Sequence, residues 1–247
     1  MSADDPTPER PAFYTLAPGG WRDWWSLLHP PYTVWMLSYV ALGAVTATAL
    51  DLGLLGLTVA GFFLGVGVTA HALDELKGRP LGTRLPDGAL WTAALVALAG
   101  AVALGIYGGT LVGWWVLAFI GFGTFIVLAY NLELFGGAFH SDLWFALAWG
   151  AFPALTGAFA QSGNLRWAAI PVAAACAAAS WAQRVLSTPV RRLRREVVRV
   201  DGALTLGDGR AEPLSAASLR AAPEGALRAL SLAMPLLAGG LVLARVG

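Results

Sequence analysis

Residues 88–132 contain no charged side chain and read GALWTAALVALAGAVALGIYGGTLVGWWVLAFIGFGTFIVLAYNL. A membrane-spanning helix needs about 20 mostly apolar residues, so this stretch is long enough for two spans. Gly108 and Gly109 mark the expected break between them. The stretch therefore predicts two consecutive helices that cross a lipid bilayer.

The composition of the whole chain agrees with this prediction. Of the 247 residues, 57% are hydrophobic and only 13% are charged, against about 25% charged in a typical soluble domain. The net charge of +1 gives no electrostatic footprint for nucleic acid, which we exclude as a partner. The single cysteine, Cys176, excludes a disulfide framework and a cysteine-based metal cluster within one chain. We interpret the chain as an integral membrane protein in contact with membrane lipid.

Further apolar segments of the required length recur along the chain. They lie at about 32–50, 53–73, 89–107, 110–130, 142–161, 166–187 and 225–245. The predicted fold is all-α, a polytopic membrane bundle of about seven transmembrane helices.

The basic residues predict the orientation, because cytoplasmic loops are enriched in Lys and Arg. With the N-terminus inside, the cytoplasmic side receives all the Lys and Arg residues except Arg166 and Arg245, that is 14 of 16. An odd number of spans places the C-terminus outside. We expect a protein of the cytoplasmic (inner) membrane.

The same pattern divides the chain into four parts. Residues 1–31 are polar and aromatic and predict a cytoplasmic or interfacial segment, followed by a six-helix core over 32–187 and a last helix over 224–247. Residues 188–223 form a basic cytoplasmic segment, in which 197–202 and 203–209 resemble short strands of a hairpin. The basic run from Arg191 to Arg195 is interpreted as a topology determinant.

Three groups of polar residues fall at one cytoplasmic boundary. His71, Asp74 and Glu75 project from one helical face, since they are three and four residues apart. The other two groups are the loop that contains Tyr130, Asn131, Glu133, His140 and Asp142, and the pair Gln183 and Arg184. Ionisable residues near a membrane core are costly, so their convergence predicts one site. Alternatively, Asp74, Glu75 and Asp142 pair with Lys77, Arg79 and Arg84 as solvated boundary charges.

The nitrogen and oxygen donors of this group suit a divalent metal. The candidate ligands are His71, Asp74, Glu75, Glu133, His140 and Asp142. Carboxylate-rich sets suit Mg²⁺, which we predict, and sets of histidine and carboxylate also suit Fe, Mn or Zn.

Two stretches resemble the UbiA superfamily of intramembrane prenyltransferases. Residues 71–88 (HALDELKGRPLGTRLPDG) are similar to its first aspartate-rich motif, and residues 142–157 (DLWFALAWGAFPALTG) to its fifth helix. The sequence departs from the family pattern at His71 and Glu75, at Leu134 where a Lys is typical, and after the sixth helix, where no carboxylate precedes Glu196.

The resemblance implies a helical bundle with a central cavity, in which metal-bound aspartates and basic side chains hold a prenyl diphosphate. It makes Asp74, Glu75, Tyr130 and Asn131 candidate catalytic residues. The candidate substrate-binding residues are Arg79, Arg84, Gln183, Arg184 and Trp149. Trp149, Phe152 and Phe159 are expected to line the cavity for the lipid tail.

Three functions stay open. The first is a UbiA-like enzyme that transfers or cyclises the prenyl group of an isoprenoid. The second is a metalloenzyme with histidine and carboxylate ligands that acts on a lipid or quinone-like molecule without diphosphate chemistry. The third is a non-catalytic lipid-binding membrane partner.

Overall fold

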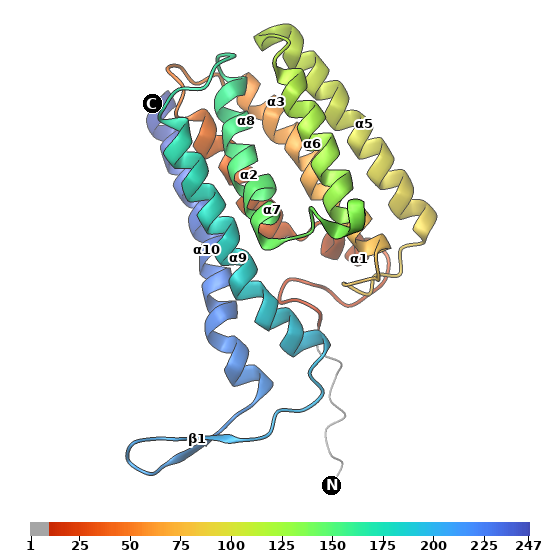
Figure 1. The fold of residues 1–247 in the computed structure, drawn as a ribbon, viewed down its shortest axis with the longest axis vertical. Coiled ribbons are helices and arrows are strands. Elements are labelled where there is room, and N and C mark those ends of the chain that lie inside the picture. The colour runs from red at the N-terminus through yellow and green to blue at the C-terminus, as the bar shows by residue number, and fades with distance from the viewer. Residues whose placement is uncertain (1–9) are drawn as a thin grey trace.

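The computed structural model describes residues 10–247 as a bundle of long helices (Figure 1). Residues 1–9, the start of the predicted interfacial segment, lie outside the described residues. The helical elements are α1 (Trp21–Leu27), α2 (Pro30–Ala44), α3 (Leu52–Phe62), the π-helix η1 (Phe63–Ala70), α4 (His71–Leu76), α5 (Asp87–Val112), α6 (Val116–Asn131), η2 (Phe135–Gly137), α7 (Asp142–Ala146), the π-helix η3 (Leu147–Ala151), α8 (Phe152–Ala160), α9 (Ala169–Arg195) and α10 (Ala216–Val246).

Five helical segments in the described part are long and apolar enough to cross a membrane. They are Leu52–Leu76, Asp87–Val112, Asp142–Ala160, Ala169–Arg195 and Ala216–Val246, and Val116–Asn131 is a shorter apolar helix. Large apolar side chains on them face outward, among them Val96 and Leu236. The chain is therefore an all-α membrane protein in contact with lipid, as its composition predicts.

Several boundaries differ from the predicted ones. The break between α5 and α6 falls at Gly113, whose φ of 125° suits glycine, and not at Gly108 and Gly109. Helix α2 ends at Ala44, and α9 continues through the basic run to Arg195. The hairpin pairs β1 (Ala203–Thr205) with β2 (Ala211–Pro213), so residues 197–202 are not its first strand. The hydrophobic pattern locates helices, whereas local backbone geometry decides where they stop.

Close helix crossings hold the centre of the bundle. A Cβ atom at Gly157 would lie 2.1 Å from the Val40 carbonyl oxygen, and one at Gly43 would lie 1.8 Å from that of Ala154. The missing side chains let α2 and α8 approach backbone to backbone, which is how small residues pack membrane helices. Fully buried Trp35 and Tyr39 on α2 complete this core.

The two ends of the bundle differ in charge. The hairpin extends beyond the bundle where α9 ends and α10 begins, and the C-terminus lies at the opposite end (Figure 1). We call the hairpin end the arginine-rich end, because Arg191, Arg192, Arg194 and Arg195 lie in the last turns of α9. The loops around α1 and α4 lie at this end as well.

Candidate functional site

A polar cavity of about 570 Å³ lies at the arginine-rich end. Its walls come from residues 11–14, the start of α2, α4, the end of α6, α7 and the second half of α9. Of the residues predicted for the site, it is lined by His71, Asp74, Tyr130, Asn131, His140, Trp149, Gln183 and Arg184. The tertiary structure thus brings the three polar groups of the sequence together around one space.

Helix α9 contributes a cationic stripe to the cavity. Arg184, Thr188, Arg191 and Arg195 all line it, and spacings of four, three and four residues put them on one helical face. Arg184 donates to the Asp142 carboxylate at 2.9 Å, and its guanidinium lies 5.3 Å from the centre of the Phe145 ring. Guanidinium groups bind phosphate and carboxylate oxygens in a planar, two-pronged geometry, so this stripe suits an anion.

A pair of stacked histidines also lines the cavity. The rings of His29 and His71 lie 4.2 Å apart and nearly parallel. The Nδ1 atom of His71 donates to the Gly67 carbonyl oxygen at 3.0 Å, within the π-helix η1 that precedes α4. Because a carbonyl only accepts, the Nε2 atom of His71 is left as the acceptor. π-Helical turns are frequent at functional sites.

Tyr14 holds the second histidine of this pair. Its hydroxyl lies 2.7 Å from the Nδ1 atom of His29. Burial, and then the neighbouring Tyr32, raises the pKa of Tyr14 well above 10.0. Burial, followed by His71, Arg195 and Arg191, lowers the pKa of His29 well below 6.5. The tyrosine therefore keeps its proton and donates it in a hydrogen bond to a neutral imidazole.

Two buried polar atoms at the cavity have no hydrogen-bond partner among the described residues. They are the hydroxyl of Tyr130 and the Oε1 atom of Gln183, and both residues line the cavity. The Tyr130 ring is fixed by stacking on His140, at a centroid distance of 4.4 Å. An unsatisfied buried polar group costs free energy, so these two atoms are suited to a ligand with polar groups.

Five predicted site residues lie outside the cavity lining. Glu75 is fully buried, and its carboxylate accepts from the backbone N–H groups of Leu81 and Thr83 and from the Thr83 hydroxyl. These donors belong to a loop without regular structure, whose buried N–H groups need acceptors. Glu75 therefore shapes the loop after α4, although its helical spacing predicts a place beside His71 and Asp74.

The other four form ion pairs or backbone contacts around the rim. Arg79 pairs with Asp87 and donates to the Leu85 carbonyl. Glu133 lies 3.7 Å from Lys77, and Asp142 pairs with Arg184. The backbone N–H of Arg84 donates to Asp23 at 3.2 Å. Lys77 and Arg79 thus pair with Glu133 and Asp87, which are not the partners that the alternative of boundary charges names, while Asp142 orients a cavity arginine.

The described residues do not bring three or more His, Cys, Asp or Glu side chains together as a metal-binding group. A resident Fe, Mn or Zn centre takes several such ligands. Mg²⁺ differs, because it enters enzyme sites with one or two carboxylates plus substrate phosphates. Asp74 and Glu196 are the carboxylates that line the cavity, and Asp74 is the one on the predicted motif.

Sequence reasoning missed part of the site. Tyr14, His29 and Tyr32 line the cavity, although none of them belongs to the three polar groups that the sequence places at one boundary. Arg191 and Arg195 do so as well, although the basic run looks like a topology determinant. Their spacing of seven and eleven residues from Arg184 is the signal that could have placed them on one face of a longer helix.

A second, apolar cavity of about 140 Å³ lies between the helices. It is lined by η1, α3, α5, α6 and α8, with Trp149 and Phe152 among its walls. Phe159, also predicted for the lining, instead stacks on Phe119 at 4.8 Å. Trp149 lines both cavities and separates the polar one from the apolar one.

Comparison with known proteins gives no relative of this chain: no protein-family model, curated protein or solved structure matches it.

Proposed function

We propose that this protein is a UbiA-like membrane enzyme that binds the phosphate or diphosphate group of an isoprenoid or similar lipid in its polar cavity and transfers or cyclises the prenyl group. The observation that carries the proposal is that the arginine stripe of α9 lines the same cavity as two buried polar atoms, the Tyr130 hydroxyl and the Gln183 Oε1 atom, which have no partner among the described residues. The anionic group would bind Arg184, Arg191 and Arg195, with the Tyr130 hydroxyl as a neutral donor. Charge-assisted hydrogen bonds of this kind are stronger than neutral ones.

The apolar cavity supports a lipid-like tail on the same ligand. It begins behind Trp149, where the polar cavity ends, and its walls are aliphatic and aromatic. A molecule with a charged head and a prenyl tail would use both spaces at once. The partner class is accordingly an isoprenoid or quinone-like amphiphile, drawn from the lipid phase.

The chain's own residues would supply leaving-group stabilisation. Cleavage of an allylic carbon–oxygen bond leaves the electron pair, and so the negative charge, on the phosphate oxygen, where preorganised guanidinium groups stabilise it. Phe145 and Trp149, stacked at 5.7 Å, would exclude water from the carbon that becomes electron-poor. Mg²⁺ bound by Asp74 would neutralise further charge on the diphosphate when it accompanies the substrate.

The number of membrane spans and the orientation of the bundle in the membrane belong to the same proposal. We propose that α2 and α6 cross the bilayer together with the five longer segments, giving seven spans. Helices of 15 and 16 residues are about 22–24 Å long, which a locally thinned bilayer accommodates. The concentration of arginines at the hairpin end supports a cytoplasmic position for that end in an inner membrane, with the C-terminus outside.

The test uses the purified full chain in lipid nanodiscs. Inorganic pyrophosphate and farnesyl diphosphate are titrated with and without Mg²⁺, and binding and pyrophosphate release are measured. Arg191→Gln should weaken binding of both by about tenfold or more, since a charge-assisted contact is lost. Arg199→Gln is the matched control, because Arg199 pairs with Asp201 on the exposed segment after α9.

Each outcome has a consequence. Binding with release of pyrophosphate supports the enzyme. Binding without release from any allylic diphosphate favours the non-catalytic lipid-binding partner. Equal affinities for the parent and Arg191→Gln, or no binding at all, would overturn the proposed site. Stoichiometric Fe, Mn or Zn in the purified protein would instead support the metalloenzyme.

A further inference from the structure

Residues 10–16, which we call the N-terminal strap, form a wall of the polar cavity without forming a helix or strand. Pro11, Ala12, Phe13 and Tyr14 all line the cavity. The other walls are helices of the bundle or loops tied to them, so they are held by regular hydrogen bonding and packing. The strap depends on individual side-chain contacts, which makes it the least constrained wall.

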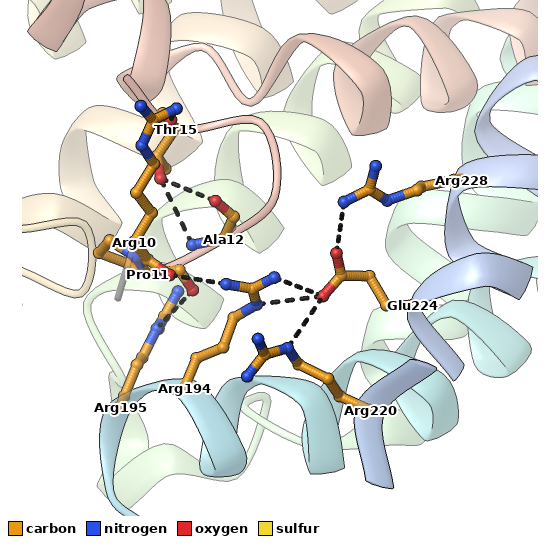
Figure 2. Close-up of polar contacts among 9 residues, drawn as sticks. All are labelled: Arg10, Pro11, Ala12, Thr15, Arg194, Arg195, Arg220, Glu224 and Arg228. Carbon is orange, nitrogen blue, oxygen red and sulfur yellow. Dashed lines mark hydrogen bonds and ion pairs between the residues drawn. The ribbon is translucent and has the colours of Figure 1, made fainter. Parts of the chain in front are cut away.

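Two arginines of α9 hold the outer side of the strap (Figure 2). Arg194 donates from Nη1 to the carbonyl oxygen of Arg10 at 3.1 Å, and Arg195 donates from Nε to that of Pro11 at 3.4 Å. On the inner side, Tyr14 bonds His29 at 2.7 Å. Further along the chain, the N–H of Leu16 donates to the Ser26 hydroxyl at 3.0 Å.

Glu224 of α10 binds one of these two arginines, Arg194 (Figure 2). The residue is 6% exposed, and its carboxylate accepts from Arg194 at 2.6 Å and from Arg228 at 2.6 Å, with Arg220 at 3.9 Å. Arg194 is thereby oriented toward the Arg10 carbonyl, while the Arg228 guanidinium lies 4.7 Å from the centre of the Phe13 ring. One buried carboxylate thus positions two of the cations that contact the strap.

Arg195 connects the strap to the cavity. It donates to the Pro11 carbonyl and also lines the space in which the cationic stripe lies. An anion that binds Arg195 competes with a neutral carbonyl for the same guanidinium, and a charged acceptor is the stronger partner. Binding of an anion in the cavity and release of the strap are therefore coupled through the side chain of Arg195.

We infer that the N-terminal strap is a releasable closure of the polar cavity on its aqueous side, and that Glu224 is the positioning residue that keeps it fastened. Water-soluble molecules reach the cavity when the strap detaches from Arg194 and Arg195. The inference concerns access to the space and goes beyond the proposed function.

The experiment measures access with a thiol probe and needs no natural ligand. Gln183, 4% exposed and part of the cavity lining, is replaced in a Cys176→Ala background to give Gln183→Cys as the only thiol. The full chain in nanodiscs is treated with anionic sulfonatoethyl methanethiosulfonate, and the labelling rate is followed by mass spectrometry. Because the probe itself reports the opening, a failure of the proposed function leaves this measurement unaffected.

Glu224→Gln should raise the labelling rate about tenfold or more. The reason is that the Arg194 guanidinium loses its charged acceptor and no longer holds the strap in place. Tyr14→Phe, which removes only a hydroxyl, should raise the rate about threefold. Arg199→Gln is the control and should leave the rate unchanged, since Arg199 contacts Asp201 and not the strap. Equal rates in the parent and Glu224→Gln, or an equal rise in the control, overturn the closure.

A separate measurement guards against global unfolding. Cys176 is 1% exposed in the bundle core. In a second preparation that retains Cys176 and carries only Glu224→Gln, the probe should therefore not react with Cys176. If Cys176 becomes reactive, Glu224→Gln has loosened the whole bundle, and the test then rests on Tyr14→Phe. If Tyr14→Phe leaves the labelling rate at Gln183→Cys unchanged, the closure is overturned.

Discussion

The two cavities of this protein meet at Trp149 but are built from opposite kinds of residue. The polar cavity takes arginines, histidines and tyrosines from the ends of helices and from the N-terminal strap. The apolar cavity takes mainly glycine, leucine, valine and phenylalanine from η1, α3, α5, α6 and α8. The difference agrees with the cost of charge in a membrane, which is high at the centre of the bilayer and low near its surface.

The largest expected effect concerns the glycines that hold this arrangement together. Gly157→Ala places a Cβ atom 2.1 Å from the Val40 carbonyl oxygen, at a backbone contact that cannot yield. We expect a loss of about 3 kcal/mol or more in the free energy of unfolding, or no folded protein. Gly61→Ala is the control, because it faces open space beside the apolar cavity. Similar thermal stabilities of the two variants would show that α2 and α8 do not cross this closely.

The next effect removes the wall between the cavities. Trp149→Ala should cost about 3–5 kcal/mol of stability, because a large ring that is 4% exposed leaves a void. The merged space should still bind inorganic pyrophosphate, since the arginines of α9 stay in place. Denaturation and pyrophosphate titration of one preparation check both statements. Complete loss of pyrophosphate binding in a folded variant would place Trp149 in contact with the anion.

A smaller change should affect the tail alone. Gly65 lines the apolar cavity, and a Cβ atom there has no neighbour within 4 Å. Gly65→Val fills this space and should weaken binding of farnesyl diphosphate about tenfold, since buried methylene contacts of about 0.8 kcal/mol each are lost. Affinity for inorganic pyrophosphate should not change. Gly56→Val is the control, because Gly56 lies in the same segment, Leu52–Leu76, but outside the cavity lining. Equal losses of affinity for farnesyl diphosphate in both variants would contradict the separation of head and tail.

The smallest expected effect is a pH dependence that belongs to the polar cavity. Burial, then His71, Arg195 and Arg191, keeps the pKa of His29 well below 6.5, and Tyr14 bonds the neutral ring. The unfolded chain therefore binds more protons than the folded one, so stability should fall as the pH drops below about 6.5. His29→Gln should show a shallower fall of the unfolding midpoint between pH 7 and pH 5. An unchanged slope would mean that His29 is already charged in the folded protein.

Much of the fold follows from hydropathy. The uncharged stretch over 88–132 predicts two helices, and α5 and α6 occupy it, although the break falls at Gly113 and not at the preceding glycine pair. Helix ends are harder to predict because they depend on single backbone angles, whereas a span depends on the sum of many side chains. The extension of α9 to Arg195 escaped prediction for a related reason, since its last two turns are polar and leave no hydrophobic signal.

The candidate site was only partly visible in the sequence. The groups around Asp74, Tyr130 and Arg184 could be assigned to one boundary, and all three residues line the polar cavity. Glu75 has the right spacing but turns to the loop at Leu81 and Thr83, because unpaired backbone N–H groups there need a carboxylate. The spacing of residues along the sequence predicts which face of a helix they share, but it does not predict which residue a side chain will contact.

The sequence by itself determined that this chain is helical, apolar and rich in arginine at one boundary, because these properties are sums over local side chains and need no contact between distant residues. Only the tertiary structure decided that Tyr14 meets His29, that His29 stacks on His71, and that Glu224 gathers arginines from two helices beside the strap. These contacts join residues far apart in the chain, and their formation depends on how α2, α4, α9 and α10 pack. Packing of this kind is fixed by close glycine crossings and buried polar partners in three dimensions, which no one-dimensional pattern records.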